Sequence, residues 1–231
     1  HEKLALGLHA PSMKVHARCL CRLLGLTVRL FLRAHLQHPH HEHHASLVIG
    51  TGAIARNMAR AAAATRPFTG ICYGLDTEMS AEFAASMSEE LEMPFKVAES
   101  AQELCGESDI IFTQTTGSST VLEKDWLKES GVTIIASGSD QPTKQEIPND
   151  VLKASKYIAD LVKQTSKVGE LRGPLQAGVM TEDDVYAELG EIVNGDKPGR
   201  EGNEIIVVDL TGTGAQDAAI GQVAWDKLSI L

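Results

Sequence analysis

Short apolar runs alternate with amphipathic stretches along most of this chain. The apolar runs predict strands at residues 47–49, 68–73, 95–98, 109–113, 132–136, 156–160 and 204–210. Between and after them, the spacing of apolar residues predicts helices at 56–64, 78–91, 100–105, 170–177, 182–194 and 216–228. This alternation is typical of a parallel sheet covered by helices on both faces. The pattern therefore predicts a doubly wound α/β domain over residues 46–231.

A glycine-rich turn joins the first predicted strand to the first predicted helix. Its sequence is Gly50-Thr51-Gly52-Ala53-Ile54-Ala55, which has the form G-x-G-x-x-A. The first glycine permits a tight turn, the second lets phosphates approach the backbone, and the small alanine lets helix pack on strand. The helix N-terminus adds N–H groups and the positive end of a dipole. The segment predicts a Rossmann-like pyrophosphate site, although an ordinary tight strand-to-helix turn could have the same sequence.

Two later segments also follow strands, where ligands bind in open parallel sheets. Residues 113–119 are rich in hydroxyls, and Thr115 and Thr116 could hydrogen-bond a ribose or nicotinamide; alternatively, they form a turn that caps a helix near Glu123. In the segment 137–146, Asp140 stands near Gly138, just past a buried strand. That position suits a proton-transfer residue, but Asp140 could also only begin a turn.

Three further positions are candidate cofactor contacts. Thr211 and Gly212 follow the last predicted strand, so their backbone amides could face the same crevice. Asp76 follows the second predicted strand and could bind the ribose 2′-hydroxyl of NAD, or else cap the helix that begins near Glu78. No arginine stands at positions 74–77 to bind a 2′-phosphate, which favours NAD over NADP.

The charge distribution divides the chain near residue 45. Residues 1–44 hold all nine histidines, whereas the remainder carries 15 basic and 29 acidic residues. So acidic a surface argues against binding to a nucleic-acid backbone. The histidine cluster at 38–44 matches no defined zinc spacing, so we predict no metal site and leave residues 1–45 as a separate, unassigned segment.

The cysteines and the leucine-rich stretch bear on location. Four cysteines show neither a C-x-x-C pair nor a disulfide framework, which favours a reducing, cytoplasmic compartment. The leucine-rich stretch 20–32 is interrupted by Arg22 and Arg29, so it is too short and too charged to span a bilayer. We therefore expect no membrane association.

Taken together, these segments resemble the ornithine cyclodeaminase/mu-crystallin family from about residue 46 to the C-terminus. The resemblance rests on the glycine turn, Thr115-Thr116, and the ranges 138–146, 188–191, 198–200 and 209–219. It implies an NAD(P)-dependent enzyme that transfers hydride between nicotinamide and the α-carbon of an amino acid or its imine. It also implies that the aspartate matching Asp140 moves the proton, and that the glycine turn and the Thr115-Thr116 loop hold the cofactor.

The resemblance also implies an N-terminal domain that binds the substrate and builds a homodimer. Residues 1–45 do not look like that domain, although they could be a remnant of it. We expect the chain to be a fragment, or to have a miscalled start. The alternative function is a non-catalytic, crystallin-like NAD(P)-binding protein or an inactive truncated homologue.

Overall fold

The computed structural model describes residues 50–65, 67–214, 217–218, 221–222 and 225–226. The predicted strand at 47–49, the histidine cluster and the segment 1–45 lie outside the described residues. So does most of the predicted closing helix at 216–228.

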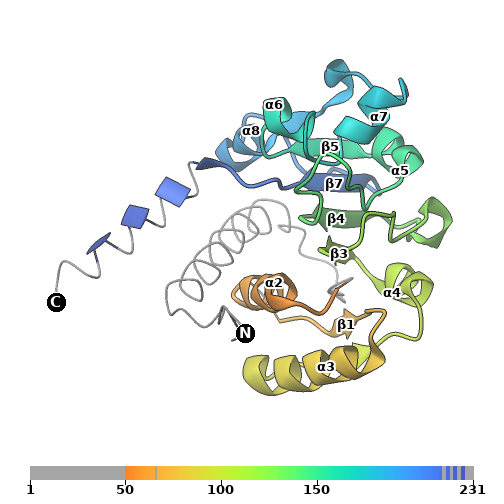
Figure 1. Ribbon diagram of the computed structural model, residues 1–231, viewed down its shortest axis with the longest axis vertical. Helices are drawn as coiled ribbons and strands as arrows, with labels where there is room; N and C mark the ends of the chain where they lie inside the picture. The colour runs from red at the N-terminus through yellow and green to blue at the C-terminus, as the bar shows by residue number, and fades with distance from the viewer. Residues whose placement is uncertain (1–49, 66, 215–216, 219–220, 223–224, 227–231) are drawn as a thin grey trace, which may run out of the picture.

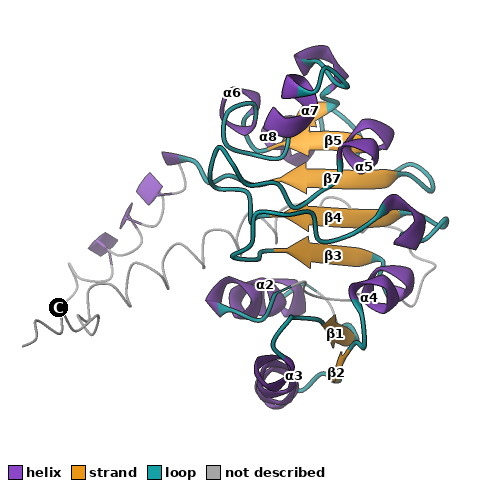
Figure 2. Ribbon diagram, turned by 45° about the vertical axis from the view of Figure 1, so that its right-hand side comes forward, coloured by secondary structure: helices purple, strands orange, loops and turns teal. Residues whose placement is uncertain are grey.

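The described strands form two parallel sheets. The larger has five strands in the order β3-β4-β7-β5-β6, and the smaller pairs β1 with β2. The strands of the larger sheet run in one direction (Figure 2). Their bounds are β1 Gly70–Cys72, β2 Phe95–Val97, β3 Ile110–Thr113, β4 Val132–Ala136, β5 Lys156–Ala159, β6 Ala187–Glu188 and β7 Ile205–Asp209.

Helices connect these strands along the chain (Figure 1). Their bounds are α2 Ala53–Ala63, α3 Thr77–Leu91, α4 Ala101–Glu107, α5 Asn149–Ala154, α6 Val162–Thr165, α7 Arg172–Gln176 and α8 Leu189–Asn194, with 3-10 turns at Lys124–Trp126 and Glu182–Asp184.

Alternate residues of the central strands enter two different cores. Phe112 and Ile135 join the cluster that includes α2 and α3, whereas Ile111 and Ile134 join the cluster that includes α4 and α5. Successive strand side chains point to opposite faces, so a strand buried on both faces is apolar throughout. The predicted doubly wound α/β fold is confirmed.

The structure corrects several predicted elements. The predicted helix at 182–194 is a 3-10 turn, the short strand β6 and then α8. Ala187 and Glu188 pair with β5, and this strand pairing prevails over local helix propensity. The segment after Glu123 contains only the turn Lys124–Trp126, and α5 and α6 were not predicted because both are only one to two turns long.

Two further predictions concern cysteines and membranes. Cys72 and Cys105 are free, and burial raises the pKa of their thiols to about 11 and about 12. Both are therefore unreactive core residues near neutral pH. Within the described part of the chain, every helix is too short or too polar to cross a membrane.

Candidate functional site

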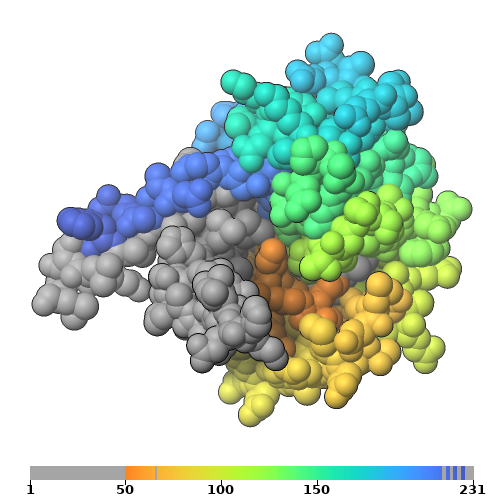
Figure 3. Space-filling model, viewed as in Figure 1, coloured from red at the N-terminus to blue at the C-terminus, as the bar shows by residue number. Residues whose placement is uncertain are grey.

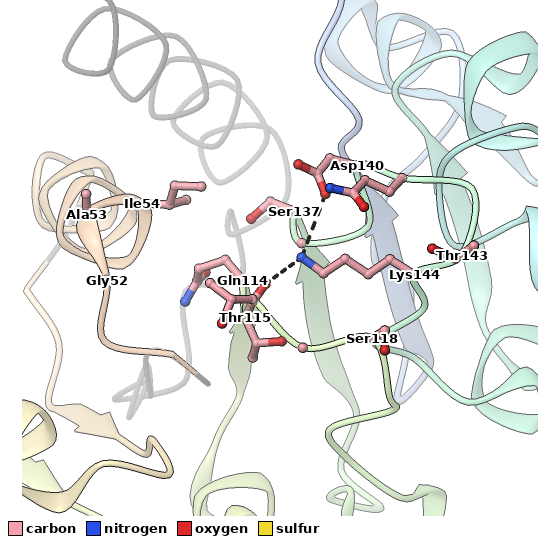
Figure 4. A pocket seen from close by; sticks show the side chains of 14 residues that line it. Gly52, Ala53, Ile54, Gln114, Thr115, Ser118, Ser137, Asp140, Thr143 and Lys144 are labelled. Atoms are coloured by element: carbon pink, nitrogen blue, oxygen red, sulfur yellow. Dashed lines mark hydrogen bonds and ion pairs between the residues drawn. The ribbon is translucent and has the colours of Figure 1, made fainter. Parts of the chain in front are cut away.

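A pocket of about 390 Å³ lies between the start of α2 and the segments that follow β3 and β4. The space-filling view shows the orange residues of α2 beside the green residues that follow these strands (Figure 3). Side chains and backbone from three places in the sequence therefore meet there (Figure 4). Its lining comprises Gly52, Ala53, Ile54, Gln114, Thr115, Thr116, Gly117, Ser118, Ser137, Gly138, Asp140, Gln141, Thr143 and Lys144.

The first side of the pocket is the N-terminus of α2. No side chain caps this helix, and its first turn contains no acidic residue. The preceding Gly50 has φ +113°, and a side chain there would collide with the carbonyl of Gln114. This side thus presents an uncapped, positively polarised helix end, the arrangement that binds phosphate anions.

The second side is the hydroxyl-rich segment after β3. The Thr115 backbone N–H and hydroxyl both donate to Glu146 Oε1, at 2.6 and 2.7 Å. Thr116 and Ser118 are exposed in the pocket. The alternative role of this segment as a helix cap is not seen, because no side chain caps the turn at Lys124–Trp126.

The third side is the segment after β4, which carries Asp140. The Asp140 side chain is 66% exposed, and its Oδ1 lies 3.7 Å from Lys144 Nζ. Lys144 is only 12% exposed and donates a 2.5 Å hydrogen bond to the Thr115 carbonyl. Figure 4 shows this lysine reaching between Asp140 and Thr115. Asp140 thus faces the pocket from a chain segment that also turns, with Lys144 N–H donating to the Gln141 carbonyl.

Sequence reasoning did not select Lys144 as a site residue. Its signal was present in the segment 138–146, where a lysine stands four residues after Asp140. That spacing alone does not show that the lysine also contacts Thr115, because Thr115 lies on a different strand end.

A line of buried carboxylates lies beneath the pocket, and sequence reasoning missed it as well. Glu146, Glu170 and Asp209 are each at most 1% exposed. Glu170 N–H donates to Asp209 Oδ2 at 2.7 Å, and Glu146 N–H donates to Glu170 Oε1 at 3.0 Å. Tyr157 donates its hydroxyl hydrogen to Asp209 at 2.5 Å.

Burial governs the protonation of Glu170 and Asp209. It raises the pKa of Glu170 from its ordinary 4.5 to about 7, and nearby Glu146 adds to the rise. It also raises the pKa of Asp209 well above its ordinary range, and the neighbouring charge of Glu170 acts in the same direction. The charged forms lose hydration that buried neighbours only partly replace.

Glycine at position 138 is required by this packing. A Cβ there would collide with the carboxylate of Glu146. The close approach brings the Asp140 segment down onto the buried acid that holds Thr115. Glu146 therefore connects the second and third sides of the pocket.

Five of the predicted cofactor residues do not line this pocket, namely Gly50, Thr51, Asp76, Thr211 and Gly212. Asp76 is exposed and caps α3, accepting a 3.0 Å hydrogen bond from Met79 N–H. The amides of Thr211 and Gly212 donate to the Asp160 carboxylate at 2.7 and 2.9 Å. In the structure these two amides already have a protein acceptor, and a cofactor role for all five residues stays a prediction.

Comparison with known proteins places the chain in a family. The model of the ornithine cyclodeaminase/mu-crystallin family matches residues 35–230. This chain belongs to that family. The resemblance drawn from the glycine turn and the segment 138–146 is thereby confirmed.

This chain matches only part of the length of each relative named here. The chain is 33% identical over 184 residues to a Delta(1)-pyrroline-2-carboxylate reductase of Bacillus cereus, covering 78% of this chain and 56% of the relative. The chain thus spans about half the length of the curated relatives it matches.

Two solved structures share the fold. One is a Delta(1)-pyrroline-2-carboxylate reductase of Thermococcus litoralis in complex with NADH and L-proline, with a TM-score of 0.82 and 25% identity, covering 90% of this chain and 64% of that one. The other is an archaeal alanine dehydrogenase dimer with bound NAD, with a TM-score of 0.79 and 27% identity, covering 88% and 62%.

Proposed function

We propose that this chain is an NAD(P)-dependent enzyme that interconverts an amino acid and its imine, with the dinucleotide bound by the described domain. The observation that carries the proposal is the pocket between the uncapped start of α2 and the Asp140–Lys144 pair. A helix end suited to binding an anion and a carboxylate suited to proton transfer thus face one space. Family membership and the NADH and NAD bound to the two structural neighbours support the same function.

The residues of the first side fit a pyrophosphate. Gly52, Ala53 and Ile54 have small or apolar side chains, and their helix end has no competing cap or acid. Backbone N–H groups there are suited to hold the phosphates, and Thr115, Thr116 and Gly138 to contact the nicotinamide half. We propose NAD as the cofactor, since no basic side chain stands at 74–77.

A cofactor held by these residues would supply the redox chemistry, which is hydride transfer between nicotinamide and the α-carbon of the substrate. Asp140 supplies a proton to the substrate nitrogen in the reducing direction and removes it in the oxidising direction. Lys144 contacts both the Asp140 carboxylate and the Thr115 carbonyl. It therefore orients Asp140 and fixes the distance between this acid and the cofactor-binding segment after β3. The substrate is an amino acid or a cyclic or open-chain imine. A homodimer and a cytoplasmic location stay predictions.

The test combines NADH binding with turnover. NADH fluorescence titration measures the Kd, and NADH consumption is followed with a panel of cyclic imines and of 2-oxo acids plus ammonia. We expect wild-type turnover, and an Asp140→Asn variant with turnover lowered about 100-fold or more at an unchanged Kd, since a positioned acid contributes a factor of roughly 10² to 10⁴.

Glu129→Gln is the matched control, because it neutralises an exposed carboxylate outside the pocket lining. It should leave both measurements unchanged. NADH binding without turnover in the wild type would favour the non-catalytic binding protein, and the absence of NADH binding would refute both functions.

A further inference from the structure

One buried carboxylate holds both ends of the segment that carries Asp140. We define residues 139–147 as the Asp140 loop. At its start, the Ser139 hydroxyl hydrogen bonds to Glu170 Oε1. At its end, the backbone N–H groups of Glu146 and Ile147 donate to Glu170, with N–O distances of 3.0 to 3.2 Å. The loop is therefore closed through a single side chain from another part of the chain.

Glu170 is itself fixed to the sheet. Its backbone N–H donates to the Asp209 carboxylate at the end of β7, and Asp209 in turn accepts from the Tyr157 hydroxyl on β5. The titratable groups that face Glu170 are Glu146, Asp209 and Tyr157. The anchor thus rests on two central strands and not on a surface loop.

The reactive groups stand between the two anchored ends. Asp140 follows Ser139 directly, and Lys144 precedes Glu146 by two residues. Arg172, two residues after Glu170, donates a 3.3 Å hydrogen bond to the Lys144 carbonyl. Movement of either end would shift Asp140 relative to Thr115, and displacements of about 1 Å in such groups cost roughly 100-fold in rate.

We propose that Glu170 is a positioning residue, whose bonds to both ends of the Asp140 loop set the place of Asp140 in the pocket. The inference rests on the proposed function, because it assumes that Asp140 moves the proton. Glu170 would thus govern the rate of the chemical step without touching cofactor or substrate, while the α2 side of the pocket would be independent of it.

The Glu170→Gln variant separates the contribution of the Glu170 hydrogen bonds from that of its charge. Its carbonyl oxygen could accept both backbone N–H groups, and its amide could donate to the Ser139 hydroxyl oxygen. Leucine has a similar size and can make none of these bonds. Glu170→Gln should therefore keep the Asp140 loop in place, whereas Glu170→Leu should release it.

The experiment uses the full 231-residue chain with NADH as the probe. Amide hydrogen exchange over 139–147 reports release of the loop, and NADH titration and steady-state turnover report binding and chemistry. For Glu170→Leu we expect exchange at Glu146 and Ile147 to be faster by about tenfold or more, since each lost bond to a charged acceptor is worth about a tenfold change. Its kcat should fall at least about tenfold, with Kd for NADH within about threefold.

Two matched variants control for stability. Leu104→Ala removes a fully buried side chain on α4 and should lower the overall stability without faster exchange confined to 139–147. Glu170→Gln should retain wild-type exchange in the loop and kcat within about threefold. If Glu170→Leu does not fold, Ser139→Ala releases one end only and should reduce kcat by a smaller factor at unchanged Kd.

Two results would overturn the positioning role. One is wild-type exchange in the Asp140 loop of Glu170→Leu or, if that variant does not fold, wild-type kcat in Ser139→Ala. The other is a Glu170→Gln variant as impaired as Glu170→Leu. Absent turnover in the wild type would instead refute the proposed function, and loop exchange would still show whether Glu170 holds the loop.

Discussion

Two of the three sides of the pocket, the α2 side and the Asp140 side, are built in different ways. The α2 side consists of backbone and small side chains, with no side-chain cap and no nearby acid. The Asp140 side consists of functional side chains, anchored from below by Glu146 and Glu170. One side therefore leaves its hydrogen-bond donors available to a ligand, whereas the other uses buried acids to place its charged groups.

The N-termini of the two neighbouring helices α3 and α4 sharpen this contrast, whereas α5, α6 and α7 also begin without a side-chain cap. Asp76 caps α3 and Ser100 caps α4, each through a side-chain oxygen that accepts an N–H hydrogen bond of the first turn. Such caps stabilise a helix by about 1 kcal/mol. Among these three helices, α2 alone has no such cap, and its N-terminus is the one that lines the pocket.

The largest expected effect concerns the pH dependence of stability on the Asp140 side. Burial raises the pKa of Glu170 to about 7, so between pH 4.5 and 7 the folded protein keeps a proton that the unfolded chain releases. Stability therefore falls as the pH rises through this window. Glu170→Gln should reduce the difference in unfolding free energy between pH 5 and pH 8 by up to about 3 kcal/mol, measured by urea denaturation.

Asp209 is retained in both proteins, so its own pH dependence acts in the same direction in each. Because the Glu170 charge adds to the rise in the Asp209 pKa, the comparison between Glu170→Gln and wild type measures Glu170 together with its effect on Asp209. An identical loss of stability in the two proteins would show that Glu170 does not titrate in this range.

The next prediction concerns the α2 side, where a substitution at Gly52 would give the helix a side-chain cap. Gly52 has an extended backbone with φ −81°, and a Cβ there would meet open space. Gly52→Asp should therefore cap α2 and raise the unfolding free energy by roughly a few tenths of a kcal/mol, since glycine is already a fair N-cap residue. Because its charge and its hydrogen bond compete with the phosphates, the Kd for NADH should rise about tenfold or more.

Gly52→Asn is the matched variant, since it caps a helix almost as well without a charge. It should give a similar gain in stability and a smaller loss of affinity. Unchanged NADH binding in Gly52→Asp would be incompatible with a pyrophosphate at this helix end.

The smallest effect separates the two roles considered for Asp76. Asp76→Ala should lower the unfolding free energy by about 1 kcal/mol, because α3 loses its cap, whereas Asp76→Ser should restore most of it. Thermal denaturation measures both. If Asp76 also binds the ribose, Asp76→Ser weakens NADH binding by about tenfold. An unchanged Kd would leave Asp76 as a helix cap only.

Local sequence signals predicted the fold and part of the pocket. The apolar runs located the strands from β1 to β5 and β7, and the glycine turn located the start of α2, because each depends on neighbouring residues. The strand β6 escaped prediction, because its two residues become a strand only by pairing with β5. Lys144 was missed for a similar reason, since its partner Thr115 lies 29 residues away.

By itself, the sequence determined the order of the longer strands and helices, the glycine turn before α2 and the presence of an acid just after β4. Those properties follow from the side chains and backbone preferences of adjacent residues. Only the tertiary structure decided that Glu170 and Asp209 lie beneath the Asp140 loop, because their hydrogen bonds join segments 23 to 39 residues apart. An isolated Glu or Asp in a sequence is indistinguishable from a surface charge until folding buries it.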